Sequence, residues 1–211
     1  IGLAREMGNI LKKKVKFPSF KVNEVGGSVG DYISVVVREK RLCPLYSGRV
    51  VVDVSIGPSP EWLKKRIESV GIRSINNVVD VTNYVLMEYG HPLHAFNLDL
   101  LEGKRIVVRR GKPGETLTTL DGNLRVADEN TLLICDEKKP VALAGIMGGS
   151  NSEIRAETRQ IFLESAYFNP LSIRRTARRL FLSTESSYRF ERGVDPEGLV
   201  PAINRAAYLI S

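Results

Sequence analysis

Side chains that could act on a bound substrate are concentrated in a few short segments of the chain. Both histidines, His91 and His94, lie directly after a run of helical periodicity that ends at Gly90. That run contains Asn83 and several other short polar side chains, which compete for the backbone and form helices inefficiently. Two interpretations carry similar weight: amides that tie down neighbouring loops, or amides and an imidazole held at the rim of a cleft.

A carboxylate and a glycine-rich segment lie further along the chain. Glu164 has apolar neighbours in a predicted strand over residues 160–168, and a carboxylate is rarely buried without a partner. Residues 141–150 include Gly148 and Gly149 but lack the signatures of phosphate-binding and dinucleotide-binding loops. The two glycines therefore indicate either a ligand that approaches the backbone closely or a tight turn between strands.

Four arginines share one predicted helix that begins near residue 170. They are Arg174, Arg175, Arg178 and Arg179. They form either the exposed face of an amphipathic helix or a stripe that contacts phosphates. The formal net charge of +7 favours a polyanionic partner modestly.

The elements that must position these groups mix helices with strands. Before residue 100 we expect a helix, a connector, two strands and two helices, over residues 2–14, 15–30, 32–38, 49–56, 60–70 and 78–89. From about residue 104 short strands follow, with a hairpin turn at Asp121-Gly122 and a buried strand over 132–135. A final helix is expected from about residue 196. The pattern predicts an α/β fold (mixed α+β) with a mixed sheet, flanking helices and a subdomain boundary near residue 100.

Composition sets broad limits on the class of protein. The chain has 211 residues, of which 43% are hydrophobic and 26% charged, as in ordinary globular proteins. No apolar run is long enough for a membrane span, and no secretory pattern begins the chain. Cys43 and Cys135 are far apart and are expected to be reduced core thiols, with no zinc-ligand spacing. Because both ends fall within helical runs, we expect a piece of a longer protein.

Several segments together resemble one family, the β subunit of bacterial phenylalanyl-tRNA synthetase. The similar segments are Cys43-Pro44 with Tyr46, and residues 57–62, 71–85, 94–96, 144–149, 163–166 and 189–196. They cover nearly the whole chain in order. The resemblance implies the third and fourth domains of the β chain, arranged as two interlocked subdomains of mixed sheets and helices. Residues 1–20 would be the end of the preceding domain and a linker, and residues 21–211 the editing domain, with a β-rich subdomain over about 104–168 and C-terminal helices that return to the first.

The resemblance also implies an activity, hydrolysis of tyrosine wrongly esterified to phenylalanine tRNA. A pocket shaped for phenylalanine rejects an added hydroxyl by only about 10²-fold, whereas a second site that hydrogen-bonds the hydroxyl reverses the selection. Expected partners are tRNA(Phe) and the synthetase α subunit in an α2β2 heterotetramer, without membrane or DNA, in the cytoplasm. We expect neither a metal nor another cofactor in this fragment, and ATP and Mg²⁺ for the whole synthetase, whose aminoacylation site lies elsewhere.

By the same resemblance, roles are implied for individual residues. Glu164 would accept the tyrosine phenol and Gly148 would form the pocket wall, while Thr184 and Ser186 would line the pocket. His94 and Asn83 would orient the ester or the attacking water, and Arg73 would hold the end of the tRNA. The chain departs from the usual pattern at His91, Asn97, Ser186 and Tyr188, which puts the detailed hydrogen-bond pattern in question.

Two other functions remain open at the level of the sequence. The first is a non-catalytic scaffold that contacts tRNA through the four arginines. The second is a free-standing hydrolase of another aminoacyl ester. Whether His94 or a ribose hydroxyl of the tRNA activates the water also stays open, since geometry must be established before pKa.

Overall fold

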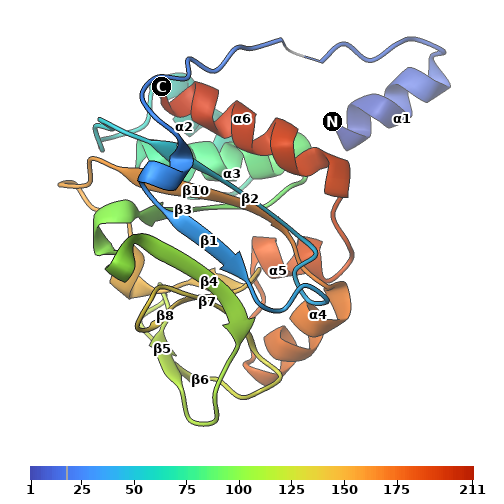
Figure 1. Ribbon diagram of the computed structural model, residues 1–211. Coiled ribbons are helices and arrows are strands. Elements are labelled where there is room, and N and C mark those ends of the chain that lie inside the picture. The colour runs from blue at the N-terminus through green and yellow to red at the C-terminus, as the bar shows by residue number, and fades with distance from the viewer. Residues whose placement is uncertain (18) are drawn as a thin grey trace.

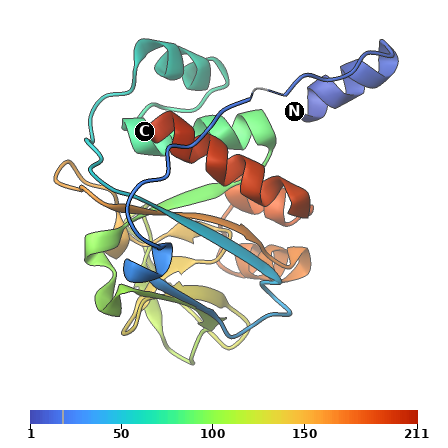
Figure 2. The same cartoon turned by 45° about the horizontal axis from the view of Figure 1, so that its top comes forward.

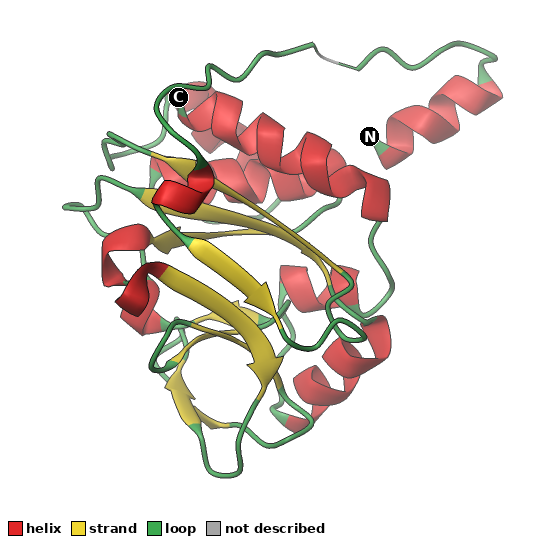
Figure 3. Ribbon diagram, viewed as in Figure 1, coloured by secondary structure: helices red, strands yellow, loops and turns green. Residues whose placement is uncertain are grey.

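The computed structural model describes residues 1–17 and 19–211, so Pro18 of the predicted connector lies outside the described residues. The described residues form three sheets, of which the third is a two-stranded ribbon. The five-stranded and three-stranded sheets, called here the larger and the smaller sheet, are stacked, and helices cover the outer face of the smaller one (Figures 1 and 3). The helices are α1 (Gly2–Ile10), α2 (Glu61–Ser69), α3 (Asn77–Tyr89), α4 (Pro170–Arg179), α5 (Glu185–Phe190) and α6 (Leu199–Ile210). The strands are β1 (Ser34–Val37), β2 (Leu45–Val51), β3 (Leu93–Asn97), β4 (Arg105–Arg110), β5 (Thr116–Thr118), β6 (Leu124–Val126), β7 (Leu132–Cys135), β8 (Pro140–Leu143), β9 (Met147–Gly148) and β10 (Ile161–Tyr167). The mixed α/β class and the flanking helices expected from the sequence are confirmed.

The smaller sheet has three antiparallel strands in the order β2-β10-β3. Its central strand, β10, is buried on both faces, which explains its nearly continuous apolar sequence. Ile161 and Leu163 face α3 and α6, whereas Phe162 and Ala166 face the larger sheet. This alternation, with period two, puts Glu164 on the face between the two sheets.

The larger sheet has the order β1-β4-β7-β8-β9, with β1 parallel to β4 and the other pairs antiparallel. Its strands come from both halves of the chain, since β1 precedes residue 100 and the others follow it. In return, β10 from the second half is the centre of the smaller sheet. The halves are interlocked in this sense, while the domain boundary near residue 100 stays a prediction.

Two hydrophobic cores lie on the opposite faces of the smaller sheet. One contains Phe96 and Phe162 with the larger sheet, and the other packs the sheet under α3 and α6, which cross it side by side (Figures 1 and 2). Cys43 and Cys135 are buried free thiols. Burial raises the pKa of each to about 12, so both are neutral thiols at physiological pH.

Local signals predicted α3 closely. The Asn76 side chain accepts a hydrogen bond from the backbone N–H of Val79, and Gly90 ends the helix in the left-handed region with φ +74°. The strand expected over 49–56 was misplaced: β2 spans Leu45–Val51, and Asp53 has a φ of +56° that is incompatible with a continuing strand.

Other element boundaries also differ from expectation. The first helix ends at Ile10 instead of residue 14, and α2 begins at Glu61 with Pro60 as its N-cap. The hairpin at Asp121-Gly122 has a three-residue loop, since the N–H of Thr119 bonds the carbonyl of Asn123. Within the described part of the chain, no helix is both long and apolar enough to cross a bilayer.

Candidate functional site

Glu164 is the buried carboxylate at the centre of the site. It is 5% exposed and sits opposite His94 on one side and Gly48 on the other, in register along β10. The side chains of directly opposed residues lie on the same face of a sheet, with about 5 Å between Cβ atoms. Glu164 and His94 therefore share the space between the two sheets.

The partner that a buried carboxylate requires is Tyr46. Its hydroxyl donates a hydrogen bond to Oε2 of Glu164 at 2.6 Å. The other oxygen, Oε1, has no hydrogen-bond partner among the described residues. Burial raises the pKa of Glu164 to about 7, and the hydrogen bond from Tyr46 opposes that shift. The carboxyl group is thus poised between its two protonation states near physiological pH.

His94 projects from β3 into the same space. Its ring packs edge-on against Phe96 with 4.4 Å between centroids, and its nitrogens make no hydrogen bond to any described residue. Burial lowers the pKa of His94 to about 4. The imidazole is therefore neutral at physiological pH and can donate one hydrogen bond and accept another.

Gly148 faces the His94 ring from the edge strand β9 of the larger sheet. A Cβ atom at residue 148 would lie 2.4 Å from Cε1 and 2.7 Å from Nε2 of His94. Only glycine fits this contact without a shift of the ring. We call Tyr46, His94, Gly148 and Glu164 the inter-sheet site.

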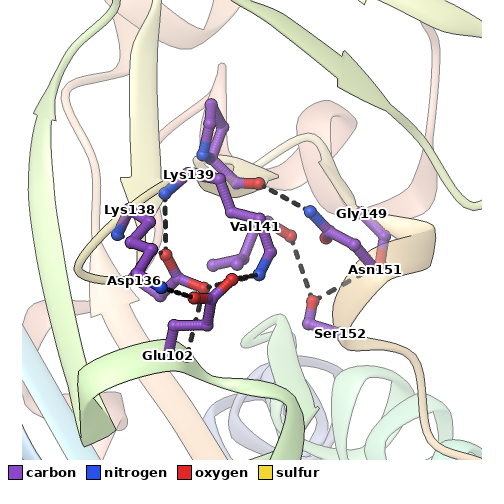
Figure 4. A network of polar contacts seen from close by, with 9 residues as sticks. Glu102, Asp136, Lys138, Lys139, Val141, Gly149, Asn151 and Ser152 are labelled. Carbon is purple, nitrogen blue, oxygen red and sulfur yellow. Dashed lines mark hydrogen bonds and ion pairs between the residues drawn. The ribbon is translucent and has the colours of Figure 1, made fainter.

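The chain on both sides of Gly148 is held by hydrogen bonds. After it, Asn151 donates to the carbonyl of Pro140 at 2.9 Å, and Ser152 donates to the carbonyls of Val141 and Gly149 (Figure 4). Before it, Thr184 donates to the carbonyl of Ile146 at 2.9 Å, and Ser186 donates to that of Gly145 at 3.0 Å. Both hydroxyls are thus donors to the glycine segment, and Thr184 also accepts the N-cap bond of α5.

The structure does not bring Arg73 to the inter-sheet site. Arg73 is exposed and precedes the N-terminal end of α3, where Ser74 and Ile75 donate hydrogen bonds to Asp80. His94 follows the opposite end of α3, and a helix of 13 residues is about 20 Å long.

Asn83 and its neighbours on α3 have other surroundings. Asn83 is half-buried and makes no hydrogen bond to Glu164 or His94, and α3 packs on the other face of the sheet through Val81 and Val85. The side-chain amide of Asn77 forms hydrogen bonds with the backbone of Ser55 and Gly57. The carboxylate of Asp80 accepts hydrogen bonds from residues 59, 74 and 75. Asn77 and Asp80 therefore tie down loops, which was one of the two interpretations.

The four arginines of α4 are all exposed. Arg179 pairs with Asp128 at 3.1 Å, whereas the other three make no ion pair among the described residues. Beside Arg178, a groove of about 470 Å³ runs between α4 and α5 and includes Phe181 and Tyr188. Phe181 is 95% exposed in a left-handed backbone conformation with φ +53°, which is rare for an aromatic residue.

Sequence reasoning assigned no role to Tyr46, although it lies in one of the similar segments. The signal that points to it is indirect: Glu164 needed a partner, and a phenol on a neighbouring strand could supply one. No local pattern links residues 46 and 164. Within the described residues no three His, Cys, Asp or Glu side chains are grouped as metal ligands.

Comparison with known proteins gives the family. Residues 42–211 match the family described as the B3/4 domain. The whole chain is 59% identical to a phenylalanine–tRNA ligase beta subunit of Geobacter metallireducens and 58% identical to that of Geobacter sulfurreducens. In each case it spans 26% of the relative's length.

A solved structure is also similar. It is an N-terminal fragment of the phenylalanyl-tRNA synthetase β-subunit from Pyrococcus horikoshii, with 12% identity and a TM-score of 0.48 over 84% of this chain and 56% of that chain. A likeness at this level leaves the assignment to the sequence comparisons. The resemblance drawn from the sequence is confirmed by them, and the chain belongs to the B3/4 domain family, in the form found in bacterial phenylalanine–tRNA ligase β subunits.

Proposed function

We propose that the inter-sheet site hydrolyses the ester of tyrosine wrongly attached to tRNA(Phe), within a synthetase that charges this tRNA with phenylalanine. The observation that carries the proposal is Glu164, a buried carboxylate with one oxygen bonded by Tyr46 and the other without a partner among the described residues. A tyrosine phenol can donate to that free oxygen. Phenylalanine would leave the oxygen desolvated and unpaired, which costs about 1–3 kcal/mol and disfavours its binding.

His94 supplies the polar group next to the bound amino acid. With a pKa of about 4, its imidazole is a weak base some three units below physiological pH, whereas efficient general bases have a pKa near the working pH. We therefore assign it the positioning of the attacking water or the ester carbonyl by hydrogen bonding.

Thr184 and Ser186 support the site through the glycine segment. Their hydrogen bonds to the carbonyls of Ile146 and Gly145 fix the backbone that leads to Gly148. Because Gly148 contacts His94 without an intervening side chain, this backbone sets the width of the space for the substrate. Arg73 and Asn83 lie outside the hydrogen-bonded cluster, and we give them no part in the chemistry.

We infer that the RNA approaches along the groove between α4 and α5. Arg178 borders it, Phe181 offers an exposed ring, and bases stack on such rings beside basic side chains in many single-strand sites. Only two residues separate Phe181 from Thr184, which contacts the glycine segment. A tRNA 3′ end bound in this groove would lie beside the segment whose hydroxyls hold the glycine segment. The non-catalytic alternative uses the same arginines and differs in giving Glu164 no role.

The intact synthetase that contains this domain provides the test. Glu164→Ala and His94→Ala are each expected to slow deacylation of tyrosyl-tRNA(Phe) by roughly 10- to 100-fold, as loss of a hydrogen bond to a charged or reacting group does. Glu157→Ala, at an exposed position, is the matched control and should clear tyrosine normally. Normal clearance by both site variants would eliminate the hydrolytic function and favour the scaffold.

The remaining expectations concern the whole enzyme. The β-subunit relatives suggest a synthetase α subunit as partner in an α2β2 assembly, with ATP and Mg²⁺ used at an aminoacylation site outside this chain, in the cytoplasm. Metal-free hydrolysis by this domain is part of the proposal. Tyrosine clearance that survives exhaustive chelation in an assay of preformed tyrosyl-tRNA would support it.

A further inference from the structure

Tyr46 occupies a position that the proposed chemistry does not yet use. It lies on β2 opposite Ala166, two residues along β10 from Glu164. Diagonal neighbours on paired strands are about 7–8 Å apart, a distance that an aromatic side chain can reach across. The side chain is half-buried and its hydroxyl ends 2.6 Å from Oε2 of Glu164.

The geometry leaves Glu164 with one fixed oxygen and one free one. A glutamate side chain has several rotamers, and burial without a donor would favour turning toward water or protonation. The bond from Tyr46 favours the rotamers in which Oε2 is occupied, and it leaves Oε1 without a hydrogen-bond partner among the described residues, on the sheet face that Glu164 shares with His94.

We propose that Tyr46 is a positioning residue of the editing site, which holds Glu164 through Oε2 so that Oε1 accepts the phenolic hydroxyl of the misattached amino acid. This inference rests on the proposed function of the inter-sheet site. The ligand class is a para-hydroxylated aromatic amino acid esterified to RNA. The pocket then contains two phenols on one carboxylate, one from the protein and one from the substrate.

The charge state of the site depends on this arrangement. The titratable groups that face Glu164 are Tyr46 on β2, Cys43 just before β2 and His94 on β3. Cys43 has a pKa of about 12 and His94 of about 4, and the pKa of Tyr46 is raised well above 10 by burial and by Glu164. None of the three changes charge between pH 5 and 9. Among these four protein groups, Glu164 is the one that titrates in this range.

The first experiment is Tyr46→Phe in the intact synthetase, assayed for tyrosyl-tRNA(Phe) deacylation from pH 5.5 to 9. Without the Tyr46 donor, no hydrogen bond opposes the rise that burial causes in the pKa of Glu164. The pH at which kcat/KM falls on the acid side is therefore expected to rise by roughly one unit. Clearance should fall about 5-fold near pH 7, because a one-unit rise in a pKa of about 7 lowers the ionised fraction there from about one half to about one tenth, and it should recover above pH 8.5. Tyr84→Phe is the matched control, because Tyr84 also donates to a glutamate, Glu88, at 3.1 Å, but on the surface of α3.

A second variant separates positioning from folding. In a Glu164→Gln background residue 164 cannot titrate, so Tyr46→Phe should produce no shift of the pH profile there. If Tyr46→Phe leaves clearance and profile unchanged while Glu164→Ala abolishes clearance, Tyr46 has no such role and the editing function stands. An equal loss at every pH would reduce Tyr46 to a structural residue and overturn the inference. If Glu164→Ala itself clears tyrosine normally, the proposed function fails first.

Discussion

The imidazole of His94 and the backbone of Gly148 are so close that a methyl group would not fit between them. The ideal Cβ at residue 148 would lie 2.4 Å from Cε1 of the ring. Overpacking of this kind forces side chains off their rotamers at a cost of about 1–3 kcal/mol. Here the ring that must move is the group assigned to orient the reacting water or ester.

Gly148→Ala is therefore expected to reduce deacylation of tyrosyl-tRNA(Phe) by at least about 10-fold in the intact synthetase, because a shift of His94 misaligns the reacting groups. Gly148→Val should reduce it further. Steady-state deacylation at pH 7.5 measures both. Gly57→Ala is the control, since a Cβ there meets no atom within 4 Å. Clearance by Gly148→Ala equal to that of Gly57→Ala would show that the contact with His94 has no functional consequence.

Single residues of the site differ in how far the sequence could reveal them. Glu164 stands out because a carboxylate within an apolar strand needs an explanation. Tyr46 could not be found in this way, because its pairing with Glu164 depends on which strands are neighbours in the sheet. Arg73 shows the reverse case: similarity suggested a place in the site, but a helix of 13 residues separates it from His94.

At the scale of elements, those with strong local signals were predicted best. The boundaries of α3 follow from the cap at Asn76 and the left-handed Gly90, both of which act within one turn. The position of β2 was missed because its neighbour β10 is more than a hundred residues away and sets its register. The helix α5 was missed because its six residues are mostly polar and too few to show a period.

The exposed face of α4 gives a prediction about RNA. Arg174, Arg175 and Arg178 make no ion pair among the described residues, whereas Arg179 is held by Asp128 and Thr131. Changing the three free arginines to alanine should weaken tRNA(Phe) binding by the synthetase and reduce the slope of log K against log salt by about 2–3.

Arg179→Ala is the matched comparison on the same helix and should change the salt slope little. Filter binding or fluorescence anisotropy at three salt concentrations measures the slopes. An unchanged slope in the triple variant would remove α4 from the RNA-binding surface. Catalysis by the inter-sheet site on RNA that does bind should be retained in either case.

At the scale of the whole molecule, the site lies in the core between the two sheets, and a second core lies on the other face of the smaller sheet. The smaller sheet separates them, and its central strand must be apolar on both faces. A carboxylate at residue 164 therefore lowers the stability of the fold. His91 is a second buried titratable group: it is 2% exposed, and neither ring nitrogen has a hydrogen-bond partner among the described residues.

These two groups should change stability with pH in opposite directions. The folded pKa of Glu164 is raised to about 7, so the folded state holds this proton more tightly and loses stability as pH rises from about 4.5 to 7. Burial lowers the folded pKa of His91 to about 4, only partly offset by Asp195, which itself pairs with Arg5. The unfolded state then takes up the proton first, and stability is lost as pH falls from about 6.5 to 4.

Urea unfolding of the chain at pH 5 and pH 7.5 tests both signs. Between pH 5 and pH 7.5 the wild type loses stability, because its folded state retains a proton on Glu164 that the unfolded state has already lost. Glu164→Gln lacks this loss, so its free energy of unfolding should rise by about 2 kcal/mol relative to that of the wild type over the same interval. The free energy of unfolding of His91→Gln should fall by a similar amount relative to that of the wild type over the same interval. The reason is that His91 destabilises the wild type at acid pH only, so removing it helps at pH 5 and not at pH 7.5. Glu157→Gln, at an exposed position, should follow the wild type. If the free energies of unfolding of all three variants change with pH as that of the wild type does, neither Glu164 nor His91 has the shifted pKa that burial imposes.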